Sequence, residues 1–314
     1  MRRVFFCTDL HGSEVCFRKF LHAGKAYQAN VVIMGGDCTG KMLIPLVSDG
    51  NGGYTCDWLG DHLHLRTPEE LAEQEKAISN NGLYPVRMTQ AELDRLDADP
   101  DRLSTLFRDT MLDRLRSWMA LAEERLRDSG LQVIFVPGND DEFSVDDVLA
   151  GSDVIQAPEG KVIRIADGEY EMLNLAWANR TPWDTPRECD EEDLTEKVRV
   201  LAEQIEDMDR AIFNIHVPPY GTGLDTAPEL EDGARVKRGG TITGPVGSTA
   251  VRDAILEYQP LLSLHGHIHE SRGMHKLGRT LSINPGSSYS DWSLQGVIVD
   301  LEGAKVKRYV PVTG

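Results

Sequence analysis

The 314-residue sequence has few cysteines, and none of them stands in a Cys-x-x-Cys pair. The five are scattered and odd in number: Cys7, Cys16, Cys38, Cys56 and Cys189. We therefore do not expect a disulfide framework or a zinc ribbon, and this cysteine usage is typical of a reducing cytosol.

Long apolar runs are also missing. No stretch approaches the ~20 apolar residues of a membrane span. The N-terminal Met1-Arg2-Arg3 leads directly into Val4-Phe5-Phe6-Cys7, without the apolar region and cleavage site of a signal peptide. We therefore expect a cytoplasmic protein that does not associate with membranes.

Positive charge is scarce, since 33 Lys and Arg residues stand against 51 Asp and Glu residues, a net charge of −18. A surface that coats nucleic acid needs clustered positive charge, so that function is not expected. A small phosphate substrate remains compatible, because a bound metal ion reverses the local charge of a site.

Two common catalytic motifs are absent or incomplete. The Gly-x-Ser-x-Gly turn of serine hydrolases does not occur, which argues against a Ser-His-Asp enzyme. Residues 35–42 nearly match the phosphate-binding P-loop, but Met42 replaces the required Ser or Thr and Pro45 follows where a helix should begin. We therefore expect no P-loop.

The pattern of apolar residues predicts an α/β protein. Residues 4–8 and 30–34 read as buried strands joined by a helix that Ser13 caps, which indicates parallel pairing. Further strands are expected at 131–136, 162–165, 171–177, 211–217, 261–264, 281–283 and 296–300, with helices at 191–206 and 248–258.

The pattern of buried apolar strands is interrupted between residues 41 and 130. Residues 49–53, Asp-Gly-Asn-Gly-Gly, predict a hairpin turn. Thr67 and Thr89 open capping boxes, and residues 103–127 form an amphipathic helix that can pack on the core, on a cap or on a second copy of the chain. We predict one domain, 1–314, with a cap inserted at about 41–130.

Five short segments place polar side chains at the ends of apolar strands. They are Asp9-Leu10-His11, Gly35-Gly36-Asp37, Gly138-Asn139-Asp140-Asp141, Asn214-Ile215-His216 and His265-Gly266-His267-Ile268-His269. Ligands bind at the carboxyl ends of strands in open α/β sheets, so the segments can converge. Carboxylate, imidazole and amide donors suit Mn, Fe, Zn, Co or Mg. Seven candidate ligand side chains are too many for one catalytic ion with an open position, but they suit two ions that share a carboxylate. Such a pair of ions is the usual arrangement in phosphoester hydrolysis.

The last segment holds three histidines at alternate positions. If it continues a strand, His265, His267 and His269 point to one face. His265 is the ambiguous member, because a buried histidine that supports the site is more common than a ligand.

This set of motifs resembles the calcineurin-like metallophosphoesterase family in order and in separation. The resemblance implies a four-layer α/β/β/α sandwich of two mixed sheets around a dinuclear site, with Mn or Fe favoured. It implies that Asp9, His11 and His269 hold the first metal, that Asn139, His216 and His267 hold the second, and that Asp37 bridges them.

One position departs from the family pattern, which usually has His after the Asn of the Gly-Asn motif. Asp140 stands there instead, and its carboxylate accepts hydrogen bonds but donates none and repels a phosphate dianion. The Asp140 carboxylate should repel a monoanionic phosphodiester less strongly than a dianionic phosphomonoester. The residues taken as catalytic candidates are Asn139, Asp140 and His216.

We therefore predict a metal-dependent phosphoesterase that favours small phosphodiesters. Two alternatives remain open. One is a phosphomonoesterase that acts on phosphoproteins or nucleotides, and the other is a scaffold that keeps the fold and has lost turnover.

Overall fold

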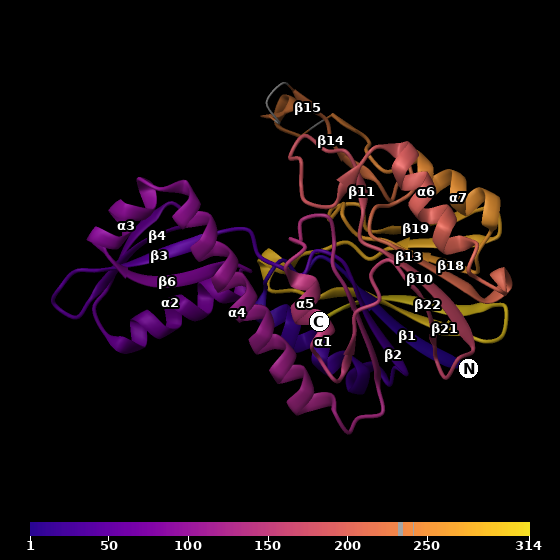
Figure 1. The fold of residues 1–314 in the computed structure, drawn as a ribbon, viewed down its shortest axis with the longest axis horizontal. Helices are drawn as coiled ribbons and strands as arrows, with labels where there is room; N and C mark the ends of the chain where they lie inside the picture. The colour runs from indigo at the N-terminus through magenta and orange to yellow at the C-terminus, as the bar shows by residue number, and fades with distance from the viewer. Residues whose placement is uncertain (232–234, 241) are drawn as a thin grey trace.

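The computed structural model describes residues 1–231, 235–240 and 242–314. Two six-stranded sheets form its centre (Figure 1), with the strand orders β22-β21-β1-β2-β7-β8 and β19-β20-β18-β13-β10-β9. The first sheet consists of β1 (Arg2–Cys7), β2 (Val31–Gly35), β7 (Gln132–Val136), β8 (Ile155–Gln156), β21 (Gln295–Leu301) and β22 (Val306–Thr313). The second consists of β9 (Val162–Ile165), β10 (Tyr170–Leu175), β13 (Ala211–Ile215), β18 (Leu262–Leu264), β19 (Gly273–Leu277) and β20 (Thr280–Asn284).

Both sheets are mixed, with a parallel centre. In the first, β1, β2, β7 and β8 pair in parallel, and β21 joins β1 antiparallel. In the second, β10, β13, β18 and β20 pair in parallel, while β9 and β19 are antiparallel edges. The carboxyl ends of the central strands within each sheet therefore lie at one edge.

Alternating side chains divide the protein into layers. On β1, Val4 and Phe6 belong to a core with residues of the second sheet such as Met172 and Ile212. Phe5, on the other face, packs in a core with helices α1 (Glu14–Tyr27), α4 (Pro100–Leu126) and α5 (Val145–Ala150). The period of two along each strand thus separates one sheet–sheet interface from one sheet–helix interface.

The second sheet is covered in the same way. Phe213 and Ile215 of β13 pack with Leu194 of α6 (Glu191–Ala202) and Val251 of α7 (Thr249–Tyr258). The order of layers is helices, sheet, sheet, helices, which confirms the predicted four-layer α/β/β/α sandwich.

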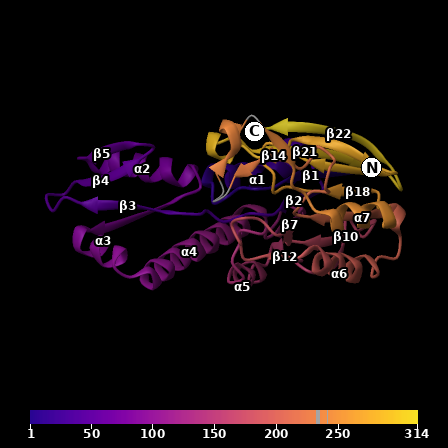
Figure 2. The ribbon, with the colours of Figure 1, turned by 90° about the horizontal axis from the view of Figure 1, so that it is seen from above.

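A smaller sheet projects to one side of this sandwich (Figures 1 and 2). Its strand order is β5-β4-β3-β6. It comprises β3 (Leu43–Ser48), β4 (Tyr54–Trp58), β5 (Asp61–Leu65) and β6 (Tyr84–Thr89), with helices α2 (Pro68–Asn80) and α3 (Gln90–Asp97). Leu46, Cys56 and Ile78 lie in a separate small core. The expected turn at residues 49–53 and both capping boxes are present. That residues 41–130 form a cap inserted into one domain stays a prediction.

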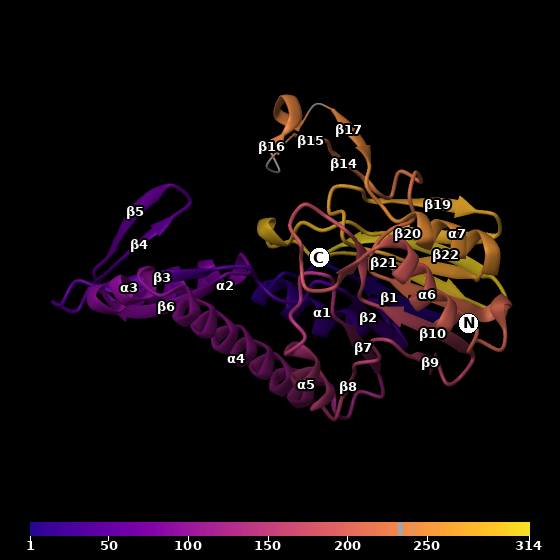
Figure 3. The ribbon, with the colours of Figure 1, turned by 45° about the horizontal axis from the view of Figure 1, so that its top comes forward.

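The remaining strands are short. They are β11 (Ala178–Asn179), β12 (Glu188–Cys189), β14 (Thr226–Pro228), β15 (Leu230–Glu231), β16 (Arg235–Val236) and β17 (Thr243–Pro245), and Figure 3 shows β14 to β17 extending away from the second sheet. Within the described ranges, no helix is both long enough and apolar enough to cross a membrane.

Candidate metal centre

The seven candidate ligands follow five strands of the two large sheets. Asp9 and His11 come after β1, Asp37 after β2 and Asn139 after β7. From the second sheet, His216 comes after β13, and His267 and His269 come after β18. The structure brings these seven side chains together in two overlapping groups.

The first group consists of Asp9, His11, Asp37 and His269, whose ligand atoms all lie within 4.8 Å of one another. His11 Nε2 lies 3.0 Å from Nε2 of His269 and 3.6 Å from Oδ2 of Asp37. Asp9 Oδ1 lies 3.4 Å from Nε2 of His269. Two carboxylates and two imidazoles at these separations can hold one divalent ion.

The second group consists of Asp37, His216 and His267. His216 Nε2 lies 3.4 Å from Oδ1 of Asp37, and the amide oxygen of Asn139 lies 2.7 Å from Nδ1 of His267. Asp37 therefore belongs to both groups, with Oδ2 toward His11 and Oδ1 toward His216. Asp37 thus offers one carboxylate oxygen to each group.

An unpartnered atom at the centre fits the presence of a cation. His216 is buried, and its Nδ1 lies 3.1 Å from the carbonyl oxygen of Gly35. Its Nε2 is buried with no hydrogen-bond partner in the described part of the chain, which is costly unless an ion occupies that side. Metal-ligating histidines commonly use one ring nitrogen for a carbonyl and the other for the metal.

The backbone at four of the candidate ligands lies in the left-handed region. Asp9, His11, Asp37 and His267 have φ values of 55°, 41°, 50° and 66°. Residues with side chains rarely adopt this left-handed region, and such strain clusters at functional sites because the surrounding fold holds it in place.

The buried charges at the centre strongly influence one another. Burial and the nearby Asp140 raise the pKa of Asp37 to about 6, although His216 opposes this. Burial disfavours charge on His216, but the carboxylates of Asp37 and Asp9 raise its pKa to about 10. For Asp9, burial is outweighed by the three neighbouring imidazoles, which lower its pKa. A positive charge among these carboxylates is therefore favoured.

Two glycines allow the ligand loops to meet. A Cβ on Gly36 would lie 1.9 Å from Nδ1 of His216, and one on Gly138 would lie 2.1 Å from Oδ1 of Asp37. Side chains at either position would displace a candidate ligand, which explains why glycine precedes Asp37 and Asn139.

Asp141 braces the same loops, and the sequence analysis did not single it out. Its buried carboxylate accepts hydrogen bonds from the backbone N–H groups of Cys38, Thr39 and Gly138, at 2.9, 2.9 and 2.8 Å. It thereby ties the loop after β2 to the loop after β7. The only signal in the sequence was a second Asp directly after Asp140.

The three histidines would share one strand face only if the strand continued through them, and the structure does not meet this condition. Strand β18 ends at Leu264, and the left-handed φ of His267 turns the chain. His265 is fully buried, with Nδ1 at 2.8 Å from the carbonyl oxygen of Ile215 and Nε2 at 2.9 Å from Oγ of Ser263. It supports the core, and burial lowers its pKa to about 4.

Asp140 lies at the rim of the centre and is paired with a cation that the sequence analysis missed. Its carboxylate forms an ion pair with the ammonium of Lys41, and its Oδ2 lies 3.9 Å from Nδ1 of His11. Its backbone N–H donates to Oδ1 of Asp37 at 3.1 Å. In the sequence, Lys41 lies in the incomplete P-loop pattern at the start of the predicted cap, and nothing there indicates its pairing with Asp140. The ring of Tyr289, also not predicted, lies 4.8 Å from that of His11.

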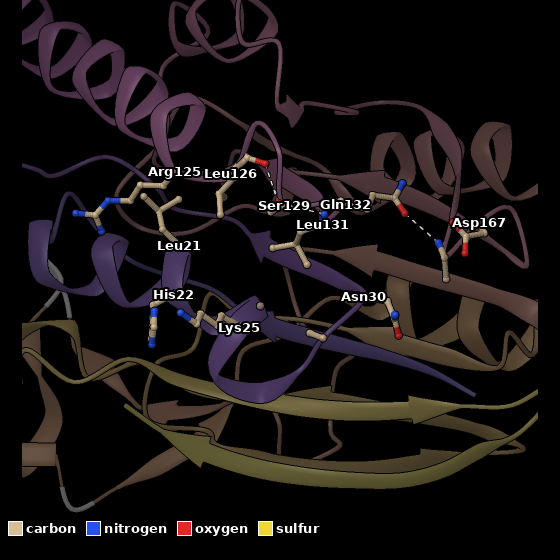
Figure 4. A pocket seen from close by; sticks show the side chains of 14 residues that line it. Leu21, His22, Lys25, Asn30, Arg125, Leu126, Ser129, Leu131, Gln132 and Asp167 are labelled. Carbon is tan, nitrogen blue, oxygen red and sulfur yellow. Dashed lines mark hydrogen bonds between the residues drawn. The ribbon is translucent and has the colours of Figure 1, made fainter.

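A pocket of about 620 Å³ lies elsewhere, between α1 and the end of α4 (Figure 4). Its lining includes Asn30, just before β2, and Gln132, at the start of β7. These are the amino ends of strands whose carboxyl ends carry the ligands. This pocket is therefore distinct from the metal centre.

Comparisons with known proteins support the fold. No protein-family model matches the chain. An uncharacterised protein, MJ1162 of Methanocaldococcus jannaschii, is 29% identical over 157 residues, which cover 49% of this chain and 64% of that protein's length. The crystal structure of TT1561 from Thermus thermophilus aligns over 100% of this chain and 98% of its own, with 13% identity and a TM-score of 0.53. A structure described as a novel archaeal phosphodiesterase aligns over 99% of both chains at 11% identity, but its TM-score of 0.36 is too low to support a conclusion.

Proposed function

We propose that this chain, whose four-layer sandwich and ligand motifs resemble those of the calcineurin-like metallophosphoesterases, is a metal-dependent hydrolase that cleaves phosphoesters at a dinuclear centre. The observation that carries the proposal is Asp37, whose two oxygens face two separate groups of ligands. A structural metal site has no need of such sharing, whereas hydrolysis of phosphoesters commonly uses paired ions.

The residues of the two groups would hold the ions. Asp9, His11 and His269 would bind one, and Asn139, His216 and His267 the other, with Asp37 between them. When bound, two divalent cations would polarise the phosphate and stabilise the charge that develops in the transition state. Manganese or iron is favoured, although zinc, cobalt and magnesium also suit these donors.

The chain's own residues around the ions would orient the substrate. Asp140 presents a carboxylate at the rim, which favours substrates with a single negative charge. The ammonium of Lys41 offsets part of the charge of Asp140. This ion pair reduces the repulsion of a dianionic monoester, so a phosphomonoesterase is the second candidate. The small sheet of β3 to β6 holds none of the seven ligands, and we assign it to the recognition of the rest of the substrate.

The test combines metal content with turnover. Purified protein should contain close to two transition-metal ions per chain and should hydrolyse bis(4-nitrophenyl) phosphate faster than 4-nitrophenyl phosphate. Loading with single metals then identifies the ion that supports the reaction. Two bound ions without any turnover of either ester would favour the scaffold alternative.

A further inference from the structure

A pocket of about 330 Å³ adjoins the rim of the metal centre. It lies between the segment that leads into β3 and the first turns of α4. Met42 and Leu43 line one side, and Leu103 and Phe107 line the other. Its volume is at the lower end of the range for pockets that bind small molecules.

Lys41 connects this pocket to the candidate ligands. It lines the pocket, and its ammonium contacts Asp140, whose backbone N–H donates to Asp37. The same Asp140 carboxylate lies 3.9 Å from Nδ1 of His11, so Lys41 is one residue removed from two of the candidate ligands. The pocket that Lys41 lines therefore adjoins the candidate centre.

The pocket wall is apolar and partly uncovered. Met42 is 55% exposed and Leu103 is 43% exposed, and the half-buried ring of Phe107 stands edge-on to Tyr84. The acidic group of the lining, Glu142, is paired with Arg108 at 3.2 Å. A bound apolar group would cover this surface and gain roughly 25 cal/mol per Å² of area removed from water.

We propose that this pocket is the substrate-selecting subsite of the metal centre, and that it takes an aromatic or branched aliphatic group esterified to the phosphate. The phosphate would lie on the ions with Lys41 beside it, and the apolar group would extend past Lys41 between Met42 and Leu103. The occupant is thus part of the substrate, a phosphoester of an apolar alcohol. This inference rests on the proposed function.

Binding of phosphonates tests the subsite without requiring turnover. The metal-loaded protein is titrated calorimetrically with methylphosphonate and with 3-phenylpropylphosphonate, which share the phosphate mimic and differ in the apolar arm. The wild type should bind the phenylpropyl compound about tenfold more tightly. Leu103→Glu, which places a charge in the wall, should reduce the ratio of the two dissociation constants to about twofold or less.

Two control variants separate this effect from general damage. Leu103→Met keeps an apolar wall and should keep the ratio. Leu256→Glu makes the same change at a leucine of similar exposure, 46%, on the distant helix α7, and should also keep it. A wild-type ratio near one, or a tenfold ratio that persists in Leu103→Glu, would overturn the subsite. If the wild type shows the tenfold ratio of dissociation constants but hydrolyses no ester, the proposed function is contradicted and the subsite is not. The pocket would then still select the ligand.

Discussion

The ammonium of Lys41 lies against the carboxylate of Asp140 and so joins the loop after β2 to the loop after β7. Each residue stands close in sequence to a candidate ligand, since Lys41 follows Asp37 by four positions and Asp140 follows Asn139 directly. The pair places a donor and an acceptor, whose charges largely cancel, at the rim of the candidate centre. In the proposed function, the preference for substrate charge depends on this balance.

Removing the ammonium group of Lys41 should shift the substrate preference of the site toward phosphodiesters. We expect Lys41→Met to lower kcat/KM for 4-nitrophenyl phosphate about tenfold more than for bis(4-nitrophenyl) phosphate, because the unpaired Asp140 then repels the second charge of the monoester. Steady-state kinetics at equal metal content measure this difference. Lys41→Arg, which keeps the charge, serves as the control. Equal losses for both esters would show that the pair does not select for substrate charge.

Asp37→Asn should reduce the metal content from about two ions per chain to one or fewer. A neutral amide cannot bridge two cations as a carboxylate does, so the variant should affect both groups of ligands. Elemental analysis of the purified protein gives the count. The exposed Asp193→Asn on α6 should retain both ions. A single ion in the wild type that is unchanged in Asp37→Asn would contradict the dinuclear arrangement.

Asp141→Ala should destabilise the protein and weaken metal retention together. It leaves the backbone N–H groups of Cys38, Thr39 and Gly138 without their acceptor, and each unsatisfied buried donor costs ~1–3 kcal/mol. Urea denaturation should show a loss of at least ~3 kcal/mol, whereas Asp147→Ala, at an exposed position on α5, should change little. Wild-type stability in Asp141→Ala would show that other contacts hold the loops.

Glu159 should make stability depend on pH near neutrality. Burial raises the pKa of its carboxyl group to about 7, with Arg187 opposing. The folded state therefore keeps the proton at pH values where the unfolded chain has lost it, so the free energy of unfolding falls as the pH rises from about 4.5 to about 7. Glu159→Gln should be more stable than the wild type by ~3 kcal/mol at pH 8 and equal to it at pH 4. Urea denaturation of metal-free protein at both pH values measures this difference, and a constant difference would contradict the assignment.

Sequence patterns predicted the buried strands, their parallel pairing and the helix caps because each depends on local order, whereas the four-layer sandwich was implied by the resemblance to a known family. Buried strands such as residues 31–35 carry uninterrupted apolar runs, and parallel strands bring their carboxyl ends to one edge. Ser13 and Thr67 cap their helices as expected. Each of these features is determined by residues within a few positions of one another.

The contacts that sequence analysis missed join residues that are distant in the chain. Lys41 and Asp140 are 99 positions apart, and Asp141 reaches back to Cys38 over 103 positions. The three histidines after β18 would share one face only if the backbone stayed extended past Leu264, and the left-handed φ of His267 turns the chain instead. Strain of this kind is imposed by tertiary packing and has no local signature.

Helix α4 is continuous over 27 residues, so a tilt at one end displaces the other end. Its second half is anchored where Trp118 stacks on Phe17, with ring centroids 4.1 Å apart, while its first turns carry Leu103 into the wall of the pocket that Lys41 also lines. The 15 positions between Leu103 and Trp118 span about 22 Å at 1.5 Å per residue, so a tilt of about 5° at the anchor moves the wall by about 2 Å. Repacking of the aromatic anchor would thus widen or narrow the mouth of a distant pocket. If the pocket is the proposed subsite, the breadth of accepted substrates changes without any substitution near the candidate ligands.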